Sequence, residues 1–115
     1  MATIKSYTDI EQSKVLAEIL PKETADFHFR YYSVLECWCD IPHYRTASHI
    51  KDLPCWSLAA LLNILAKQDF IIKSYERNDG YHYNIDIPSR HCKIWFSSLL
   101  DAAFEMVCWL KKNGK

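Results

Sequence analysis

Three cysteines and two histidines lie close together in the segment ECWCDIPHYRTASHIKDLPC, residues 36–55. Thiolate sulfur and imidazole nitrogen are preferred zinc ligands, and a structural zinc site takes four of them. On a strand, Cys37 and Cys39 would point to the same face, and His43 and His49 in the following loop would complete the set. The sequence therefore admits a zinc-stabilised protein that uses these four residues.

Core packing is the simpler interpretation of the same two cysteines. Trp38 separates them and Leu35 and Ile41 flank them, as expected at buried positions, where free cysteine behaves as a small hydrophobe. Zinc sites mostly draw their ligands from two paired knuckles. His91 and Cys92 do not form a second one, because adjacent residues point to opposite faces of a strand. We therefore favour packing and expect no metal or other cofactor.

Cys55 is the best candidate nucleophile. Residues 52–54 read Asp-Leu-Pro and predict the start of a helix, which would place Cys55 in the first turn. There the helix dipole and free amides would lower the pKa of the thiol. The spacing selects no base among the histidines, which are His28, His43, His49, His82 and His91. No glycine-rich turn suggests an oxyanion site or a phosphate cradle. Packing is again favoured over a cysteine-dependent enzyme or a thiol-reactive protein.

Two pairs of carboxylates suggest acid–base chemistry at first sight. They are Asp9 with Glu11 and Asp101 with Glu105. Both pairs fall in the first turns of expected helices, where anions complement the helix dipole. Capping explains them without catalysis.

Length and composition narrow the class of protein. The 115 residues predict one globular domain, 1–115. Fourteen basic side chains balance fourteen acidic ones, which disfavours a nucleic-acid partner and is compatible with a homodimer. Five cysteines, an odd number, without an apolar leader favour reduced thiols in the cytoplasm. The most apolar window, residues 56–66, is shorter than the roughly 20 residues that span a bilayer.

Periodicity and end signals predict three helices and five strands. The helices are expected at residues 9–20, 52–67 and 98–113, and the strands at 27–32, 34–40, 70–75, 81–87 and 92–96, with a loop at 41–52. Thr8 and Glu11 have capping-box form, Ser98 with Asp101 caps the last helix, and Gly114 ends it.

The clearest local signal is a β-hairpin with Asn78-Asp79-Gly80 at its turn. Its second strand is expected to have one buried face and one solvent-exposed face. The buried face would carry Tyr81, Tyr83, Ile85 and Ile87, and the wet face His82, Asn84 and Asp86. The order of elements predicts an α+β domain with three helices packed on a four- or five-stranded, mainly antiparallel sheet.

Three stretches resemble segments of a family of small, uncharacterised proteins encoded by anaerobic gut bacteria, often in phage-like or mobile regions. They are YTDIEQSKVLAEILPKETAD, DLPCWSLAALLNIL and DAAFEMVCWLKKNG, about 48 of the 115 residues. The resemblance implies a bacterial or phage setting in the cytoplasm and a compact accessory protein. It supplies no catalytic residues, and Cys37 and Cys39 lie outside the three stretches.

The leading interpretation is a non-enzymatic protein-interaction module, homodimeric and cytoplasmic. Its working surface would consist of exposed aromatic or apolar side chains. The alternatives are the thiol chemistry of Cys55 and the zinc site of Cys37, Cys39 and His43, with His49.

Overall fold

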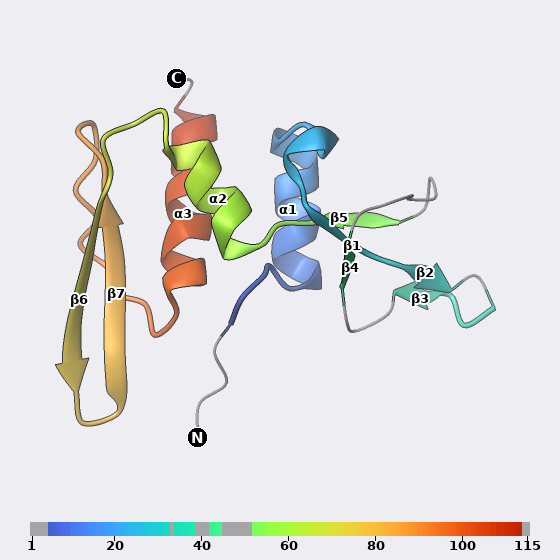
Figure 1. Ribbon diagram of the computed structural model, residues 1–115, viewed down its shortest axis with the longest axis horizontal. Helices are drawn as coiled ribbons and strands as arrows, with labels where there is room; N and C mark the ends of the chain where they lie inside the picture. Colours follow the sequence, from blue (N-terminus) through green and yellow to red (C-terminus); the bar gives the residue numbers. More distant parts are fainter. Residues whose placement is uncertain (1–4, 33, 39–41, 45–51, 114–115) are drawn as a thin grey trace.

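The computed structural model describes residues 5–32, 34–38, 42–44 and 52–113 (Figure 1). In chain order, its elements are α1 (Ile10–Ile19), the short 3-10 helix η1 (Lys22–Thr24), β1 (Phe27–Phe29), β2 (Tyr31–Tyr32), β3 (Cys37–Trp38), β4 (His43–Tyr44), β5 (Leu53–Cys55), α2 (Leu58–Leu65), β6 (Ile71–Arg77), β7 (Gly80–Asp86) and α3 (Leu99–Lys112). The chain is therefore α+β, as the order of sequence patterns predicts.

The three α-helices lie in the middle of the molecule, between two separate β regions (Figure 1). On one side, the hairpin β6–β7 packs against α3 through β7. On the other side, β5 packs against α1. The main core fills the space between the helices and β7. It includes Leu16, Trp56, Leu61, Ile85 and Met106.

The strands of the described residues form three antiparallel sheets rather than the single sheet of four or five strands that the sequence predicts. The sheets have the orders β4-β1-β5, β2-β3 and β6-β7. The helices separate the hairpin from the other two sheets, so its strands have no route to pair with β1 (Figure 1). The expected four- or five-stranded sheet is thus not confirmed within one chain.

The first helix agrees with its prediction, but its cap lies one residue later than expected. Asp9 accepts a hydrogen bond from the Gln12 amide (2.8 Å), and the Gln12 side chain accepts one from the Asp9 amide (3.2 Å). Thr8 is fully buried instead. Its hydroxyl accepts a hydrogen bond from the Trp56 amide (3.1 Å), which joins the start of the chain to the segment before α2.

The second helix begins later than predicted, because residues 53–55 form a strand. β5 pairs with β1, with Phe27 opposite Cys55. Pro54 lacks a backbone donor and is tolerated here because β5 is an edge strand. Helix α2 begins at Leu58, and the side chain of Ser57 caps it.

The strands before α2 are shorter than predicted. The expected strand at 27–32 divides at Arg30 into β1 and β2, which belong to different sheets. The expected strand at 34–40 reduces to β3, because residues 34–36 form a turn in which Glu36 has φ +52°. Part of the expected loop at 41–52 pairs with β1 as β4.

The hairpin is confirmed, with seven paired positions in unbroken register from Ile71 opposite Asp86 to Arg77 opposite Gly80. Gly80 has φ +118°, a conformation that side chains other than glycine rarely adopt. The last helix is also confirmed, from the cap Ser98 to Lys112. Gly114, its expected end, lies outside the described residues.

The two faces of β7 differ from the prediction. Ile85 and Ile87 are buried as expected, but Tyr81, expected on the same face, is exposed, and Asn84 and Asp86 are buried. The cause is the segment after the hairpin. Cys92 donates its amide to Asp86 (2.9 Å), and its carbonyl accepts from the Asn84 side chain (2.9 Å).

The prediction of a strand at 92–96 is wrong, because the main chain of Cys92 bonds to the side chains of Asn84 and Asp86. Within this segment only Phe96 makes a β-bridge in the described part of the chain, to Tyr83.

Candidate functional site

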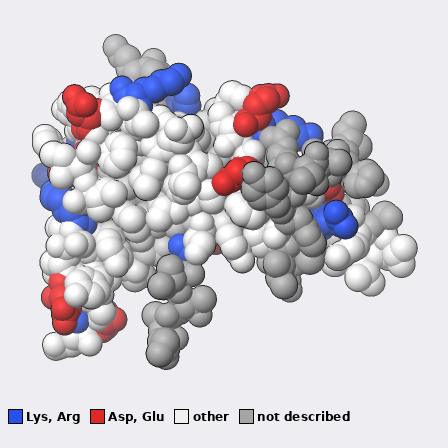
Figure 2. Space-filling view, viewed as in Figure 1, with Lys and Arg blue, Asp and Glu red and all other residues white. Residues whose placement is uncertain are grey.

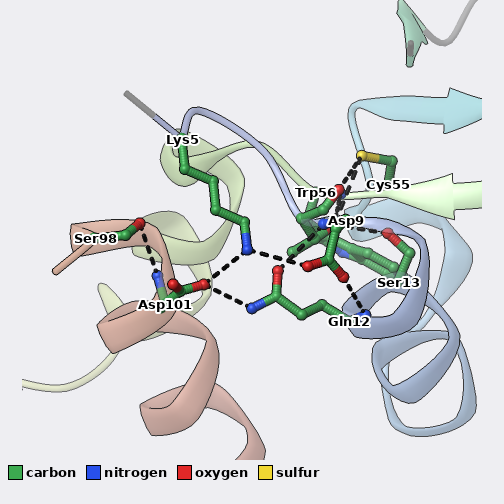
Figure 3. Close-up of polar contacts among 9 residues, drawn as sticks. Lys5, Asp9, Gln12, Ser13, Cys55, Trp56, Ser98 and Asp101 are labelled. Atoms are coloured by element: carbon green, nitrogen blue, oxygen red, sulfur yellow. Dashed lines mark hydrogen bonds and ion pairs between the residues drawn. The ribbon is translucent and has the colours of Figure 1, made fainter. Parts of the chain in front are cut away.

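Cys55 does not lie in the first turn of a helix, so the predicted activation of its thiol by a helix N-terminus does not apply. The side chain is fully buried in β5, and its sulfur contacts the carbonyl and the hydroxyl of Thr8 at 3.3 and 3.6 Å (Figure 3). Burial raises the pKa of the Cys55 thiol to about 11. At neutral pH this thiol is protonated and shielded from solvent.

The histidine nearest to Cys55 in the sheet points away from it. His28 lies opposite Pro54, whereas Cys55 lies opposite Phe27. Successive residues of a strand alternate between its faces, so His28 and Cys55 lie on opposite faces of the sheet. His28 instead lies 3.6 Å from the carboxylate of Asp52, and both side chains are buried. No nucleophile–base pair forms between Cys55 and His28.

The proposed zinc ligands fall partly outside the described residues. Cys39 and His49 lie there, and for His43 the structure gives only its backbone position in β4, opposite His28. Cys37 is exposed in β3. In the part of the chain that the structure describes, no three His, Cys, Asp or Glu side chains gather as a metal site would require. The four-ligand zinc site remains a prediction from the sequence.

A polar junction joins the start of the chain to two helix N-termini (Figure 3). The Lys5 ammonium lies 3.1 Å from the Asp9 carboxylate and 2.9 Å from the Asp101 carboxylate. Gln12 also donates to Asp101 (2.8 Å). Burial alone would lower the pKa of Lys5, but the hydrogen bonds and charges of Asp101 and Asp9 raise it above its ordinary value. The three charges of this junction are thus paired with one another, and they link the start of the chain to α1 and α3.

The hairpin exposes several large apolar side chains, as does the turn with Val34 and Leu35. All seven residues of β6 are exposed except Tyr75, which is half-buried. Large apolar side chains are exposed on this strand and around it: Ile71, Ile72, Tyr81, Ile94 and Trp95, of which Ile71 and Ile94 are the most exposed, at 63% and 61%. In the hairpin register Ile71 shares one face with Tyr75, and Ile72 shares the other face with Tyr81. Both faces of the hairpin thus expose large apolar groups, as an interaction surface does.

Aromatic side chains are stacked on one face of the hairpin. The rings of Tyr75 and Trp95 meet edge to face at a centroid distance of 4.5 Å. The ring of His82, opposite Tyr75 in the register, stacks on it at 5.3 Å. Ring contacts of this kind favour the arrangement in which these side chains lie.

Charged groups on the same face are paired. The ammonium of Lys73 lies 2.8 Å from the Asp86 carboxylate and 5.7 Å from the centre of the Trp95 ring. The hydrogen bond from Lys73 lowers the pKa of Asp86, and the Cys92 amide and His91 add to the effect. Figure 2 shows one side of the whole molecule, on which basic and acidic side chains both occur and most of them lie near the margins.

The Lys5 junction and the Tyr75–Trp95 contact were not foreseen from the sequence. Lys5 and Asp101 are 96 positions apart, and no local pattern links them. The pairing of Tyr75 with His82 follows from the hairpin register once the turn is known. Trp95 joins them only because the segment after the hairpin folds back.

Comparison of the chain with models of known families, with curated proteins and with solved structures gives no match. None of the helices in the described residues has the length and apolar character needed to cross a membrane.

Proposed function

We propose that this chain is a non-enzymatic protein-interaction module and that the hairpin β6–β7, with Trp95 beside it, is its working surface. One observation carries the proposal. β6 is a seven-residue strand in which every residue except Tyr75 is exposed, and within the described residues only β7 pairs with it. An exposed strand edge binds extended polypeptide by adding a strand, in which main-chain hydrogen bonds give affinity and side chains give specificity.

The composition of this surface also favours a protein partner. Tyrosine and tryptophan are enriched in protein interfaces, and here Tyr75, Tyr81 and Trp95 lie on or beside the hairpin. Phosphate binding by a nucleic-acid partner would require an excess of cations. Lys73 and Arg77 are instead balanced by acidic residues of the hairpin, Glu76, Asp79 and Asp86.

The proposal includes the absence of catalysis by Cys55. Three observations support this part of the proposal: the Cys55 thiol is buried, its pKa is raised, and His28 lies on the opposite face of the sheet. The setting belongs to the proposal as well. A cytoplasmic accessory role in a bacterium or a mobile element rests on the family resemblance of three segments and on the odd number of cysteines.

Site-specific photo-crosslinking tests the working surface. A photoreactive phenylalanine analogue replaces Ile72 on β6 in one protein and Val15 on α1 in a matched control, since both side chains are similarly exposed, at 42% and 43%. We expect the protein with the analogue at position 72 to form a covalent adduct with one polypeptide, identified by mass spectrometry. The same adduct should form when that polypeptide is purified and mixed with the purified protein. Equal labelling from both sites, or none from Ile72, would contradict the proposal.

A further inference from the structure

The backbone of β6 has a defined set of hydrogen-bonding groups on its open edge. Tyr83 donates to the Phe96 carbonyl (2.7 Å) and accepts from the Phe96 amide (2.8 Å), so both of its main-chain groups point away from β6. Ser74 lies opposite Tyr83, and the pair is therefore a non-hydrogen-bonded pair of the antiparallel ladder. The amide and carbonyl of Ser74 consequently face the open edge. By alternation, those of Ile72 and Glu76 face it too.

We propose that the partner on this edge is a second copy of the chain, with the two β6 strands antiparallel and centred on Ser74. This inference rests on the proposed function and names its partner. A two-fold axis at Ser74 brings Ser74 opposite Ser74 of the partner subunit and Ile72 opposite Glu76 of the partner subunit. Every residue with outward main-chain groups then meets another such residue. The two hairpins become one four-stranded antiparallel sheet.

Charge selects this register over its neighbours. In the register centred on Ser74, Lys73 lies opposite Tyr75 of the partner subunit, and Arg77 lies opposite Ile71 of the partner subunit. Like charges directly opposite each other destabilise a sheet. A centre at Lys73 or at Glu76 would place that residue opposite its own copy. A centre at Tyr75 would place Arg77 opposite Lys73 of the partner subunit.

A centre at Arg77 would place that residue opposite its own copy, and the registers centred on Ile71 and Ile72 are too short. The second of these is the longer. It would pair only residues 71–73 of the strand, because β6 begins at Ile71. The Ser74-centred register pairs all seven residues of β6. β6 contains no proline and its register with β7 has no bulge, so two of the features that block pairing at a sheet edge are absent from this strand.

The molecule exposes more surface than a compact chain of its mass. The chain exposes 7656 Å², whereas a compact monomer of 13.5 kDa exposes about 6,500 Å². The difference, about 1,100 Å², is a total over the whole molecule, and Ile71 and Ile72 of β6 are among its exposed large hydrophobic side chains. The radius of gyration is 15.0 Å, against about 13 Å for a compact chain of this length.

The first test is the molar mass of the full chain in solution, measured by sedimentation equilibrium over a range of concentrations. We expect twice the chain mass of 13.5 kDa for the wild type and for Ser74→Ala, which keeps the edge intact. Ser74→Pro removes an outward amide without touching the β6–β7 ladder, and we expect it to be monomeric with an unchanged circular dichroism spectrum. A monomeric wild type, or a folded Ser74→Pro dimer, would overturn the proposal.

A disulfide test fixes the register and does not depend on the proline variant. In an antiparallel hydrogen-bonded pair the Cα atoms lie about 5.5 Å apart, within reach of a disulfide. Ser74→Cys should therefore form a symmetric cross-link under mild oxidation, identified by peptide mass. Glu76→Cys is the matched control, because its own copy would lie roughly 13 Å away along the strands. Cross-linking of Glu76→Cys at the rate of Ser74→Cys would exclude the proposed register.

Charge changes give a third readout in folded protein. Ile72→Lys would face Glu76 of the partner subunit twice per dimer and should tighten dimerisation about 2- to 10-fold. Adding Glu76→Lys places like charges opposite each other and should weaken it by a similar factor relative to Ile72→Lys. No difference between the single and the double variant would contradict the register. A photo-crosslink from Ile72 to a different polypeptide, with a monomeric wild type, would support the proposed function and refute this inference.

Discussion

The Lys5 ammonium lies 2.9 Å from the Asp101 carboxylate, although the two residues are 96 positions apart. The contact joins the segment before α1 to the first turn of α3. Asp9, which caps α1, shares the same ammonium. The same ammonium thus contacts carboxylates at two helix N-termini, and the hydrogen bond from Gln12 to Asp101 adds a second link between α1 and α3.

We expect Lys5→Met to lower the free energy of unfolding by about 0.5–1.5 kcal/mol, because both ion pairs are partly shielded from water and Met keeps much of the packing volume. Lys67→Met, at an exposed position after α2, is the control and should change it by less than about 0.5 kcal/mol. Urea denaturation followed by circular dichroism measures both. Equal losses in the two variants would show that the junction adds nothing to stability.

The rate at which each cysteine reacts with a thiol reagent at neutral pH should depend on the burial of its side chain. Cys55 and Cys108 are buried, and desolvation raises both thiol pKa values to about 11. Cys37 is exposed. We expect Cys55→Ala to leave the number of rapidly reacting thiols in folded protein unchanged and to reduce the number titrated in denaturant by one. Loss of a rapid phase in Cys55→Ala would restore Cys55 as a reactive thiol.

The sequence predicts those elements whose signals are local. Helix α3 follows from its cap Ser98 and its apolar periodicity, and the hairpin follows from the glycine at its turn. The segment with Pro54 is different, because proline after Asp52 suits both the first turn of a helix and an edge strand. Pairing with β1 decides between them, and no local pattern encodes that contact.

The candidate site was harder to foresee for the same reason. The exposed aromatic surface was expected, but its location was not. Asn84 and Asp86 are polar and were expected to be exposed to solvent. Both are buried, because the chain reverses after the hairpin and Cys92 bonds to them. The reversal brings Trp95 onto Tyr75 and so creates the surface. A residue's polarity predicts its exposure only when nothing folds back over it.

Gly80→Ala should destabilise the hairpin through backbone conformation alone. A Cβ at this position would meet no heavy atom within 4 Å, but φ is +118°. We expect a loss of about 1–2 kcal/mol in the free energy of unfolding. The control is Asn78→Ala in the same turn, since within the described residues Glu36 is the only non-glycine residue with positive φ. Similar losses in both variants would assign the effect to the turn's side chains and not to φ.

Asp86 should give stability a pH dependence in the acid range. The hydrogen bond from Lys73, with those from the Cys92 amide and His91, lowers the pKa of the carboxyl below its ordinary value of 3.8. A carboxyl whose pKa is lower in the folded state stabilises the fold above the unfolded pKa. This stabilisation is lost as pH falls through the folded value.

We therefore expect Asp86→Asn to be about 1 kcal/mol less stable than wild type at neutral pH, with the difference shrinking as pH falls below about 4. Asn retains an oxygen that can accept from the Cys92 amide, so the loss reports mainly the charge and its pairing with Lys73. Thermal unfolding across the pH range measures both proteins, with Asp69→Asn as a control at an exposed position before β6. If the difference between wild type and Asp86→Asn is constant down to low pH, the carboxylate charge does not stabilise the fold. Because Asp86 holds the segment that carries Trp95 against the hairpin, a difference that shrinks in acid also predicts that the Tyr75–Trp95 surface loosens there.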